Sequence, residues 1–247
     1  MYPSHQAFAL ASLAGALLLA ATAAFAQGEE AAIRKNLAER LPNLPKIDEV
    51  RRTPMPGVFE LRVNETEILY TDAKGDFLIQ GSLIDTKGKR NLTEERTDKL
   101  SAIPFDQLPL KDAFTIVRGN GARKLAVFED PNCGYCKRFE RDLQKVNNVT
   151  VHLFLYPILG ADSVEKSKNL WCSKDKGRAW VDYMVNDKPI ASASCDTTAL
   201  QRNVEFGRKY RINGTPAMIF ADGNRVPGAI GAADIEKHLA TAQPDLK

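Results

Sequence analysis

The stretch Cys133-Gly134-Tyr135-Cys136 is the part of the sequence that decides the fold. It follows an apolar run over residues 125–128. Apolar residues then recur at helical spacing: Phe139, Leu143 and Val146. The pattern predicts a strand, a short turn and a helix that begins near Cys133, where unpaired backbone N–H groups and the helix dipole favour a thiolate. Cys136 lies one turn further on, so the pair indicates dithiol–disulfide exchange.

Three other interpretations of this cysteine pair compete. A zinc site needs two more ligands, usually a second close pair, but Cys172 and Cys195 stand far apart. The histidines are scattered along the chain: His5, His152 and His238. A c-type haem needs histidine directly after the second cysteine, where Lys137 stands instead. A structural disulfide remains open, although a bridge across two residues closes little chain entropy and stabilises a fold poorly.

An apolar segment near the start predicts export. Residues 7–26 are small and apolar and end in an A-F-A sequence, which predicts a cleavable secretory signal peptide over residues 1–26. Residues 1–6 contain no lysine or arginine, so an uncleaved N-terminal anchor is the alternative. In both cases we expect the rest of the chain in an oxidising compartment, where disulfides persist.

The charge of the chain argues against a nucleic-acid partner. The 34 basic and 31 acidic residues give a formal net charge of +3 over 247 residues. The densest basic clusters, Arg51-Arg52 and residues 87–90, are short and bordered by acids or turn residues. We therefore expect solvated surface and no nucleic-acid binding.

Residues 27–90 predict a small α+β domain. Apolar residues recur every four positions over residues 29–41, which indicates a helix. Strand-like runs separated by turn residues follow, over residues 58–63, 67–71 and 77–80. A small antiparallel sheet has open edges, which a second copy of the chain would cover. We therefore expect a homodimer, with its contact around residues 66–70.

Residues 91–110 predict a semi-rigid linker helix. Thr93 is the expected N-cap, and the first turn carries Glu94 and Glu95, which are favourable at the positive end of the dipole. Two prolines end the helix: Pro104 and Pro109.

Residues 111–247 predict a second domain in which strands alternate with helices. Strands are expected over residues 113–117, 124–128, 150–156, 217–220 and 224–226. Helices are expected over residues 137–146, from 162 onward, and over 178–184, 198–210 and 234–240. Asp162 and Glu165 resemble a capping box. The alternation predicts an α/β sheet with helices on its faces and a helical insertion before residue 217.

Two further features belong to the chemistry. With Cys133 and Cys136 as the redox couple, Cys172 and Cys195 are left to each other, and closing their loop contributes on the order of 3 kcal/mol as a structural bridge. The second feature is a Gly-Thr-Pro triplet that ends at Pro216, just before a predicted strand. It indicates either an ordinary turn or a cis X–Pro bond that exposes backbone near the thiols.

Several motifs together resemble a known family. They are Phe128-Glu129-Asp130 before CGYC, LWCSKDK over residues 170–176, SASCD over 192–196, Gly214-Thr215-Pro216-Ala217 and Val226-Pro227-Gly228. In this order they look like the bacterial periplasmic disulfide isomerase family, the DsbC/DsbG-type thiol:disulfide interchange proteins. Gly134-Tyr135 between the cysteines is most similar to the DsbC branch. The resemblance covers nearly the whole mature chain.

The resemblance implies a fold class and an assembly. The chain would be α/β (α+β overall), with a small α+β, cystatin-like N-terminal dimerisation domain over residues 27–90. A linker helix over residues 91–110 and a thioredoxin-like catalytic domain with a helical insertion over residues 111–247 would follow. The family also implies a V-shaped homodimer with an apolar cleft, a cis Thr215–Pro216 bond and a periplasmic location.

The resemblance also implies a mechanism. Cys133 would attack a wrong disulfide in a misfolded exported protein, and Cys136 would resolve the mixed disulfide. A membrane electron donor of the DsbD type would keep Cys133 reduced, and no metal or organic cofactor would be needed. The other implied site residues are the active-site loop, Gly134 and Tyr135, and the substrate-binding pair, Thr215 and Pro216.

Two alternatives remain at this stage. One is a chaperone or holdase of the DsbG type, whose cleft binds unfolded chains. The other is a dithiol oxidase or a reductase for cytochrome c maturation, although such proteins generally lack the N-terminal domain. The sequence also departs from thioredoxins, which carry a buried acid six residues before the first cysteine. Val127 stands there, and the acids nearest to Cys133 are Glu129 and Asp130.

Overall fold

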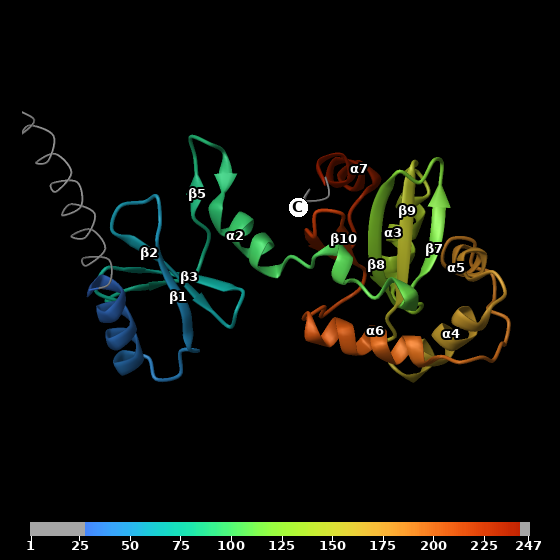
Figure 1. Ribbon diagram of the computed structural model, residues 1–247, viewed down its shortest axis with the longest axis horizontal. Helices are drawn as coiled ribbons and strands as arrows, with labels where there is room; N and C mark the ends of the chain where they lie inside the picture. Colours follow the sequence, from blue (N-terminus) through green and yellow to red (C-terminus); the bar gives the residue numbers. More distant parts are fainter. Residues whose placement is uncertain (1–27, 243–247) are drawn as a thin grey trace, which may run out of the picture. The chain divides into compact units, whose positions relative to one another are not determined.

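The computed structural model describes residues 28–242, so the predicted signal peptide over residues 1–26 lies outside the described part. The chain divides into two compact units, with the boundary between Leu100 and Ser101 (Figure 1). Each unit has a hydrophobic core of its own. None of the helices formed by residues 28–242 has both the length and the apolar character that crossing a bilayer requires.

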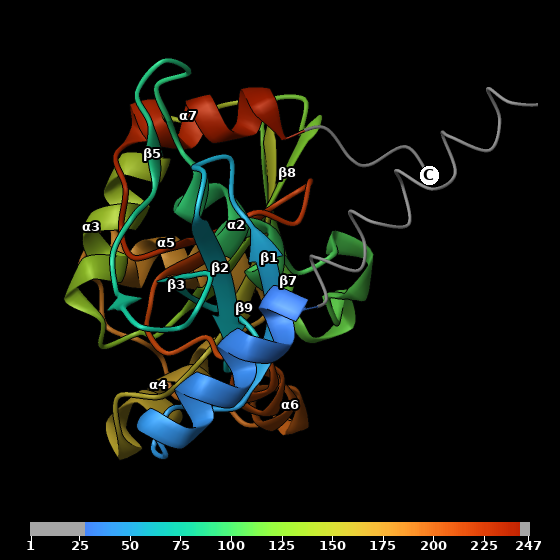
Figure 2. The same ribbon diagram turned by 90° about the vertical axis from the view of Figure 1, so that its left-hand side faces the viewer.

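The first unit packs a helix over residues 28–40 against an antiparallel sheet (Figure 2). The sheet has the order β1-β2-β3-β4, with β1 Ile47–Arg52, β2 Val58–Val63, β3 Glu67–Asp72 and β4 Leu78–Ile79. Leu61 and Val63 of β2 alternate with polar residues and are fully buried, as a strand period of two predicts. They form the core of this unit with Ile33 and Leu37 from the helix.

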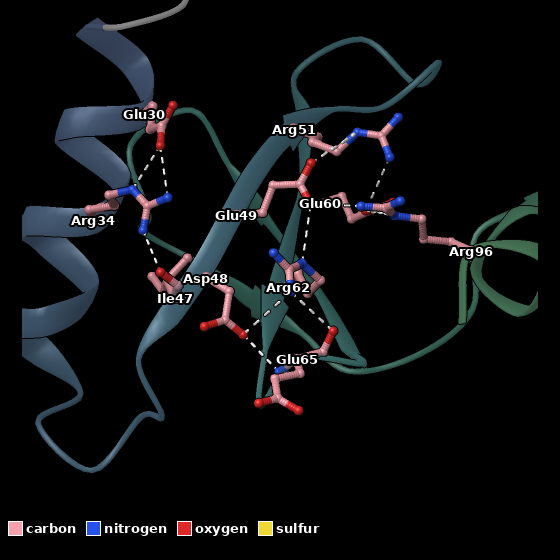
Figure 3. Close-up of polar contacts among 10 residues, drawn as sticks. All are labelled: Glu30, Arg34, Ile47, Asp48, Glu49, Arg51, Glu60, Arg62, Glu65 and Arg96. Atoms are coloured by element: carbon pink, nitrogen blue, oxygen red, sulfur yellow. Dashed lines mark hydrogen bonds and ion pairs between the residues drawn. The ribbon is translucent and has the colours of Figure 1, made fainter. Parts of the chain in front are cut away.

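Strand β1 is absent from the sequence prediction because its residues are mostly charged. The structure pairs these charges across the sheet (Figure 3). Arg62 Nε on β2 donates to Glu49 Oε2 on β1 at 3.1 Å, and an Arg62 guanidinium nitrogen lies 3.8 Å from Asp48. Charged side chains are common on edge strands, which is the position that β1 occupies.

Helix α2 (Leu92–Ser101) corresponds to the predicted linker helix and is bonded to the sheet of the first unit. Arg96 donates to Glu60 on β2 at 3.0 Å and to Glu49 on β1 at 2.7 Å (Figure 3). A short hairpin leads into α2, formed by β5 (Ile84–Asp85) and β6 (Arg90–Asn91).

The expectation that Thr93 caps α2 is wrong. Asn91 takes that role, since its Oδ1 accepts a hydrogen bond from the Glu94 backbone N–H at 3.2 Å. The Thr93 hydroxyl lies inside the first turn, where it accepts from the Leu83 backbone N–H at 2.8 Å and bonds to the Tyr70 hydroxyl. The threonine therefore joins α2 to β3 rather than capping its own helix.

The second unit is a five-stranded sheet covered by helices on both faces. Its order is β11-β10-β8-β9-β7, with β7 Phe114–Arg118, β8 Arg123–Glu129, β9 Val149–Leu155, β10 Ala217–Phe220 and β11 Arg225–Pro227. Its helices are α3 Gly134–Leu143, α4 Ala161–Cys172, α5 Lys176–Met184, α6 Thr198–Lys209 and α7 Ala232–Thr241. Strands β8 and β9 run parallel, and the other neighbours run antiparallel.

The central strand β8 places alternate side chains on opposite faces of the sheet. Leu125 and Val127 pack in one core with residues of α3 and α7. Ala126 and Phe128 pack in a second core on the other face, where Phe128 stacks on Phe206 of α6 with ring centroids 5.7 Å apart. Because both faces of β8 are covered, the strand is a near-continuous apolar run.

The predicted capping box at Asp162 and Glu165 does not form. Helix α4 begins one residue earlier, its N-cap is Gly160, and no side chain caps it. Asp162 therefore lies inside the first turn, where its carboxylate accepts from Asn132 Nδ2 at 2.8 Å and pairs with Lys166. This contact joins the start of α4 to the turn that precedes α3.

Candidate active site

Cys133 is the N-cap residue of α3. Its Sγ accepts a hydrogen bond from the Cys136 backbone N–H at 3.1 Å, and the helix begins at the next residue, Gly134. Cys133 retains 5% of its accessible surface, whereas Cys136 has none. An approaching disulfide can therefore reach only the first of the two sulfur atoms.

The turn that carries Cys133 is fixed by the buried carboxylate of Asp130. This carboxylate accepts hydrogen bonds of 2.7–3.0 Å from Asn132 N, Ile158 N, Leu159 N and Ser163 Oγ. The Cys133 turn and the segment after β9 bind the same carboxylate, so they lie side by side.

The loop before β10 supplies the other side of the site. The Thr215–Pro216 peptide bond is cis. The Thr215 carbonyl oxygen lies 3.2 Å from Cys133 Sγ and accepts a hydrogen bond from the thiol when Cys133 is protonated. The structure thus brings four of the predicted site residues together: Cys133, Cys136, Thr215 and Pro216.

The Cys133 thiol is strongly acidic. The hydrogen bond that the Cys136 thiol donates to the Cys133 sulfur is the largest cause that lowers the pKa of Cys133 to about 6. Burial opposes this shift, and hydrogen bonds from the Thr215 side chain and from backbone N–H groups of Cys136 and Tyr135 add to it. Cys133 is therefore mostly a thiolate at neutral pH, as its position at a helix N-terminus predicts.

Cys136 has the opposite character. Burial, followed by its hydrogen bond to Cys133 and the charge of Glu129, raises the pKa of Cys136 far above the ordinary range. Cys136 is therefore a neutral thiol when Cys133 is a thiolate. The two sulfur atoms therefore differ in reactivity. The Cys133 sulfur is already in the nucleophilic form, whereas the Cys136 thiol must lose a proton before it can react.

The remaining predicted site residues lie at two places. Gly134 has no neighbouring atom within 4 Å of where a Cβ would stand, and the side chain of Tyr135 is 70% exposed, so this loop faces solvent. A disulfide joins Cys172, the last residue of α4, to Cys195, with Cα atoms 5.4 Å apart. It ties α4 to the segment before α6.

Two buried acids lie near Cys136, of which the sequence analysis names only Glu129, as an acid close to Cys133, and not Glu140. Glu129 ends β8, Glu140 lies on α3, and both are fully buried. Glu140 stands four residues after Cys136, so the two side chains share one face of the helix. That spacing is the signal in the sequence, but a glutamate on a helix is normally exposed, so the pattern alone does not reveal its burial.

Brief treatment of the reduced protein with iodoacetamide is expected to label Cys133 alone. The thiolate is the reactive form, so the labelling rate should rise with pH, reach half of its plateau near pH 6 and change little above neutrality. Cys136 should stay unlabelled because it is buried and protonated. Mass spectrometry of samples labelled at pH values between about 4 and 8 and then quenched measures both the site and the rate of labelling. Label appearing first on Cys136 would contradict this assignment.

The fold and the site together define a class. A sheet with a C-x-x-C pair at a helix N-terminus, opposite a cis-proline loop, is the arrangement of thioredoxin-like thiol–disulfide oxidoreductases. Residues 110–243 match the family described as "Thioredoxin-like domain", and residues 24–94 match the "Disulfide bond isomerase protein N-terminal domain".

Individual relatives agree with these matches. A Bordetella parapertussis protein named "Probable thiol:disulfide interchange protein DsbC" is 43% identical over 208 residues, which is 84% of this chain and 73% of that protein. The Escherichia coli K12 "Thiol:disulfide interchange protein DsbC" is 32% identical over 215 residues, 85% of this chain and 87% of that protein. The crystal structure of a disulfide interchange protein from Neisseria gonorrhoeae is 35% identical, covers 56% of this chain and 100% of its own, and has a TM-score of 0.53.

The chain therefore belongs to the DsbC family of thiol:disulfide interchange proteins. The predicted family, the fold class and the enzyme class of thiol–disulfide oxidoreductase are confirmed.

Proposed function

We propose that this chain is a periplasmic disulfide isomerase with Cys133 as nucleophile and Cys136 as resolving thiol. The observation that carries the proposal is the state of Cys133, a thiol with a pKa of about 6 at a helix N-terminus, whose sulfur accepts a hydrogen bond from the Cys136 backbone N–H at 3.1 Å. A sulfur that is ionised at neutral pH attacks disulfides without a separate base.

The exchange steps conserve electrons in both outcomes. The Cys133 thiolate attacks one sulfur of a wrong disulfide, forms a mixed disulfide and releases the other substrate sulfur as a thiolate. If that thiolate attacks another bond in the same substrate, the disulfides rearrange and Cys133 leaves as a thiolate. If the substrate thiolate does not attack another disulfide, Cys136 attacks Cys133. The substrate then leaves reduced, and the enzyme becomes oxidised.

The substrates we propose are misfolded exported proteins that contain disulfides. Apolar side chains next to the Cys133 turn are open to solvent, with Tyr135 70% and Leu159 54% exposed. The backbone carbonyl of Thr215 lies 3.2 Å from Cys133 Sγ, so an extended substrate segment bound along Thr215 would lie beside the nucleophile. An apolar surface beside such a backbone segment suits an unfolded chain better than a folded one.

We propose residues 27–90 as a dimerisation domain, followed by the linker over residues 91–110 and the catalytic domain over residues 111–247. Strand β4 pairs only with Tyr70 and Thr71 of β3. Within residues 28–242, no strand covers the remaining edge of β3 beside β4. The same edge of a second copy would pair with it about a two-fold axis, at the part of the predicted contact around residues 66–70 that β4 does not cover.

The proposed location is the periplasm, reached through the predicted signal peptide over residues 1–26. The Cys172–Cys195 disulfide supports an oxidising compartment. An isomerase in such a compartment must have Cys133 kept reduced. We therefore propose a membrane electron donor of the DsbD type as a partner.

Chaperone activity is a second candidate function, favoured by exposed apolar side chains in the first unit. These are Phe77, Ile79 and Ile84, with 71%, 51% and 57% of their surface exposed. Holding an unfolded chain on such a surface does not require thiols. A variant without Cys133 separates the two functions.

Replacing Cys136 by alanine is expected to trap substrates as mixed disulfides on Cys133, because the resolving thiol is gone. Non-reducing gels of the variant with a scrambled secreted protein should show adducts that disappear with reductant, and mass spectrometry should locate the linkage at Cys133. The matched control Cys133→Ala keeps only the buried thiol and should form none. Adducts with the control variant alone would make Cys136 the nucleophile and overturn the proposal.

A further inference from the structure

The end of β8 carries a buried acid that the exchange mechanism does not yet use. Glu129 is fully buried, and within residues 28–242 no N–H or hydroxyl group donates to either of its oxygens; the Glu140 carboxyl is its polar neighbour. Glu140 on α3 is equally buried, and its Oε1 accepts from Trp180 Nε1 at 2.7 Å. A buried carboxylate without donors is costly, so two adjacent carboxyl groups must share a proton.

The surroundings decide which carboxyl group holds that proton. Burial, followed by the charge of Glu140, raises the pKa of Glu129 well above its ordinary value. Burial also raises the pKa of Glu140, but the hydrogen bond from Trp180 and the charge of Arg118, 4.0 Å away, oppose that shift. Glu129 is therefore the protonated member, and Glu140 carries the charge.

The pair acts on Cys136. Glu140 and Cys136 lie one turn apart on the buried face of α3, and the share of the pair's negative charge that falls on Glu129 contributes to the raised pKa of Cys136. The other charged and titratable groups that act on these acids are Arg118 on β7 and Cys133, the N-cap residue of α3. Val127, at the position of the thioredoxin acid, packs in the apolar core.

We propose that the Glu129–Glu140 carboxyl pair takes up the proton of Cys136 when Cys136 resolves a mixed disulfide. Glu129 accepts the proton from the Cys136 thiol and passes its own proton to Glu140. The Cys136 thiolate then attacks Cys133 Sγ, the bond from Cys133 to the substrate breaks, and the substrate leaves as a thiolate. Both carboxyl groups end neutral, so charge and electrons balance.

This inference rests on the proposed roles of the cysteines, and a two-phase experiment distinguishes the failure of each. A peptide disulfide whose halves carry different quenched fluorophores is mixed with the reduced full-length protein. Release of the first half reports attack by Cys133, and release of the second reports resolution by Cys136. A Cys136→Ala variant calibrates the assay, because it should show the first phase only. If wild-type protein shows no second phase, the proposed function fails before the inference is tested.

Glu129→Gln is expected to slow the second phase by about 10²-fold while leaving the first within about twofold, since general base catalysis contributes on this scale. In the wild-type protein the rate of the second phase should rise with pH and level off once the carboxyl pair can accept a proton. In the variant it should keep rising about tenfold per pH unit, because hydroxide replaces the pair. If Glu129→Gln does not fold, Glu140→Gln tests the same proton transfer. The glutamine keeps a side-chain oxygen that can accept the hydrogen bond from Trp180.

A Glu165→Gln variant is the matched control, because this exposed glutamate of α4 lies outside the carboxyl pair, and both phases should be unchanged. A second phase as fast as or faster than wild type in Glu129→Gln and Glu140→Gln would overturn the proposal. Equal slowing of both phases would indicate a structural role and would overturn it as well.

Discussion

Replacing Cys133 by serine is expected to lower the rate at which the full-length protein reactivates a scrambled substrate by at least about 10³-fold, the scale on which enzymes lose activity with their nucleophile. The serine hydroxyl can accept the hydrogen bond from the Cys136 backbone N–H, so α3 keeps its cap. It is not ionised at neutral pH and cannot form a disulfide. The loss is therefore chemical rather than structural.

A double variant, Cys172→Ser with Cys195→Ser, is the matched control. It removes the bridge between α4 and the segment before α6, which should reduce the free energy of unfolding by on the order of 3 kcal/mol, and it should keep exchange activity. Substantial reactivation by Cys133→Ser would contradict the proposed mechanism. If Cys133→Ser suppresses aggregation of an unfolded protein as well as wild type does, the chain is also a chaperone.

The second large effect concerns the first unit. A fragment that starts at Ser101 is expected to fold, to reduce simple peptide disulfides at the full-length rate, and to lose isomerase activity by about tenfold or more. It should start at Ser101 rather than at residue 111, because Ile103 and Leu108 are buried in the core of the second unit. In the proposed dimer the substrate would have longer contact with the enzyme, so its own thiolate could attack another disulfide before Cys136 attacks Cys133.

Sedimentation equilibrium should give a dimer for the full-length protein and a monomer for the fragment. The open edge of β3, beyond the two residues that β4 covers, is the structural reason to expect the dimer. A full-length monomer would contradict the proposed dimerisation domain. A fragment with full isomerase activity would contradict the role that we assign to the dimer.

The sequence predicts the centre of this site well because its signals are local. The spacing of Cys133 and Cys136 after an apolar run fixes a helix N-terminus, and the structure places the two sulfur atoms in the contrasting environments that this geometry produces. The Gly-Thr-Pro triplet is equally local in pattern. Its position opposite Cys133 follows from the pairing of β10 with β8, which family resemblance implies but spacing does not.

The parts that the sequence does not predict depend on distant contacts. Glu140 looks like a solvent-exposed helix residue until Trp180, 40 residues later, covers it. Asp162 looks like a cap until Asn132 binds its carboxylate. Strand β1 looks too charged for a sheet until Arg62 and Arg96 pair its acids. In each case the partner comes from another element, so periodicity along one segment cannot show it.

The most direct test of the account is the steady-state redox state of Cys133 and Cys136 in the periplasm of cells that produce the protein. Acid-quenched cells would be alkylated before and after reduction, and the cysteines would be assigned by mass spectrometry. An isomerase that starts each cycle with a free thiolate predicts Cys133 and Cys136 reduced, with Cys172 and Cys195 oxidised as an internal control. A predominantly oxidised Cys133–Cys136 pair would contradict the account and would show a dithiol oxidase instead.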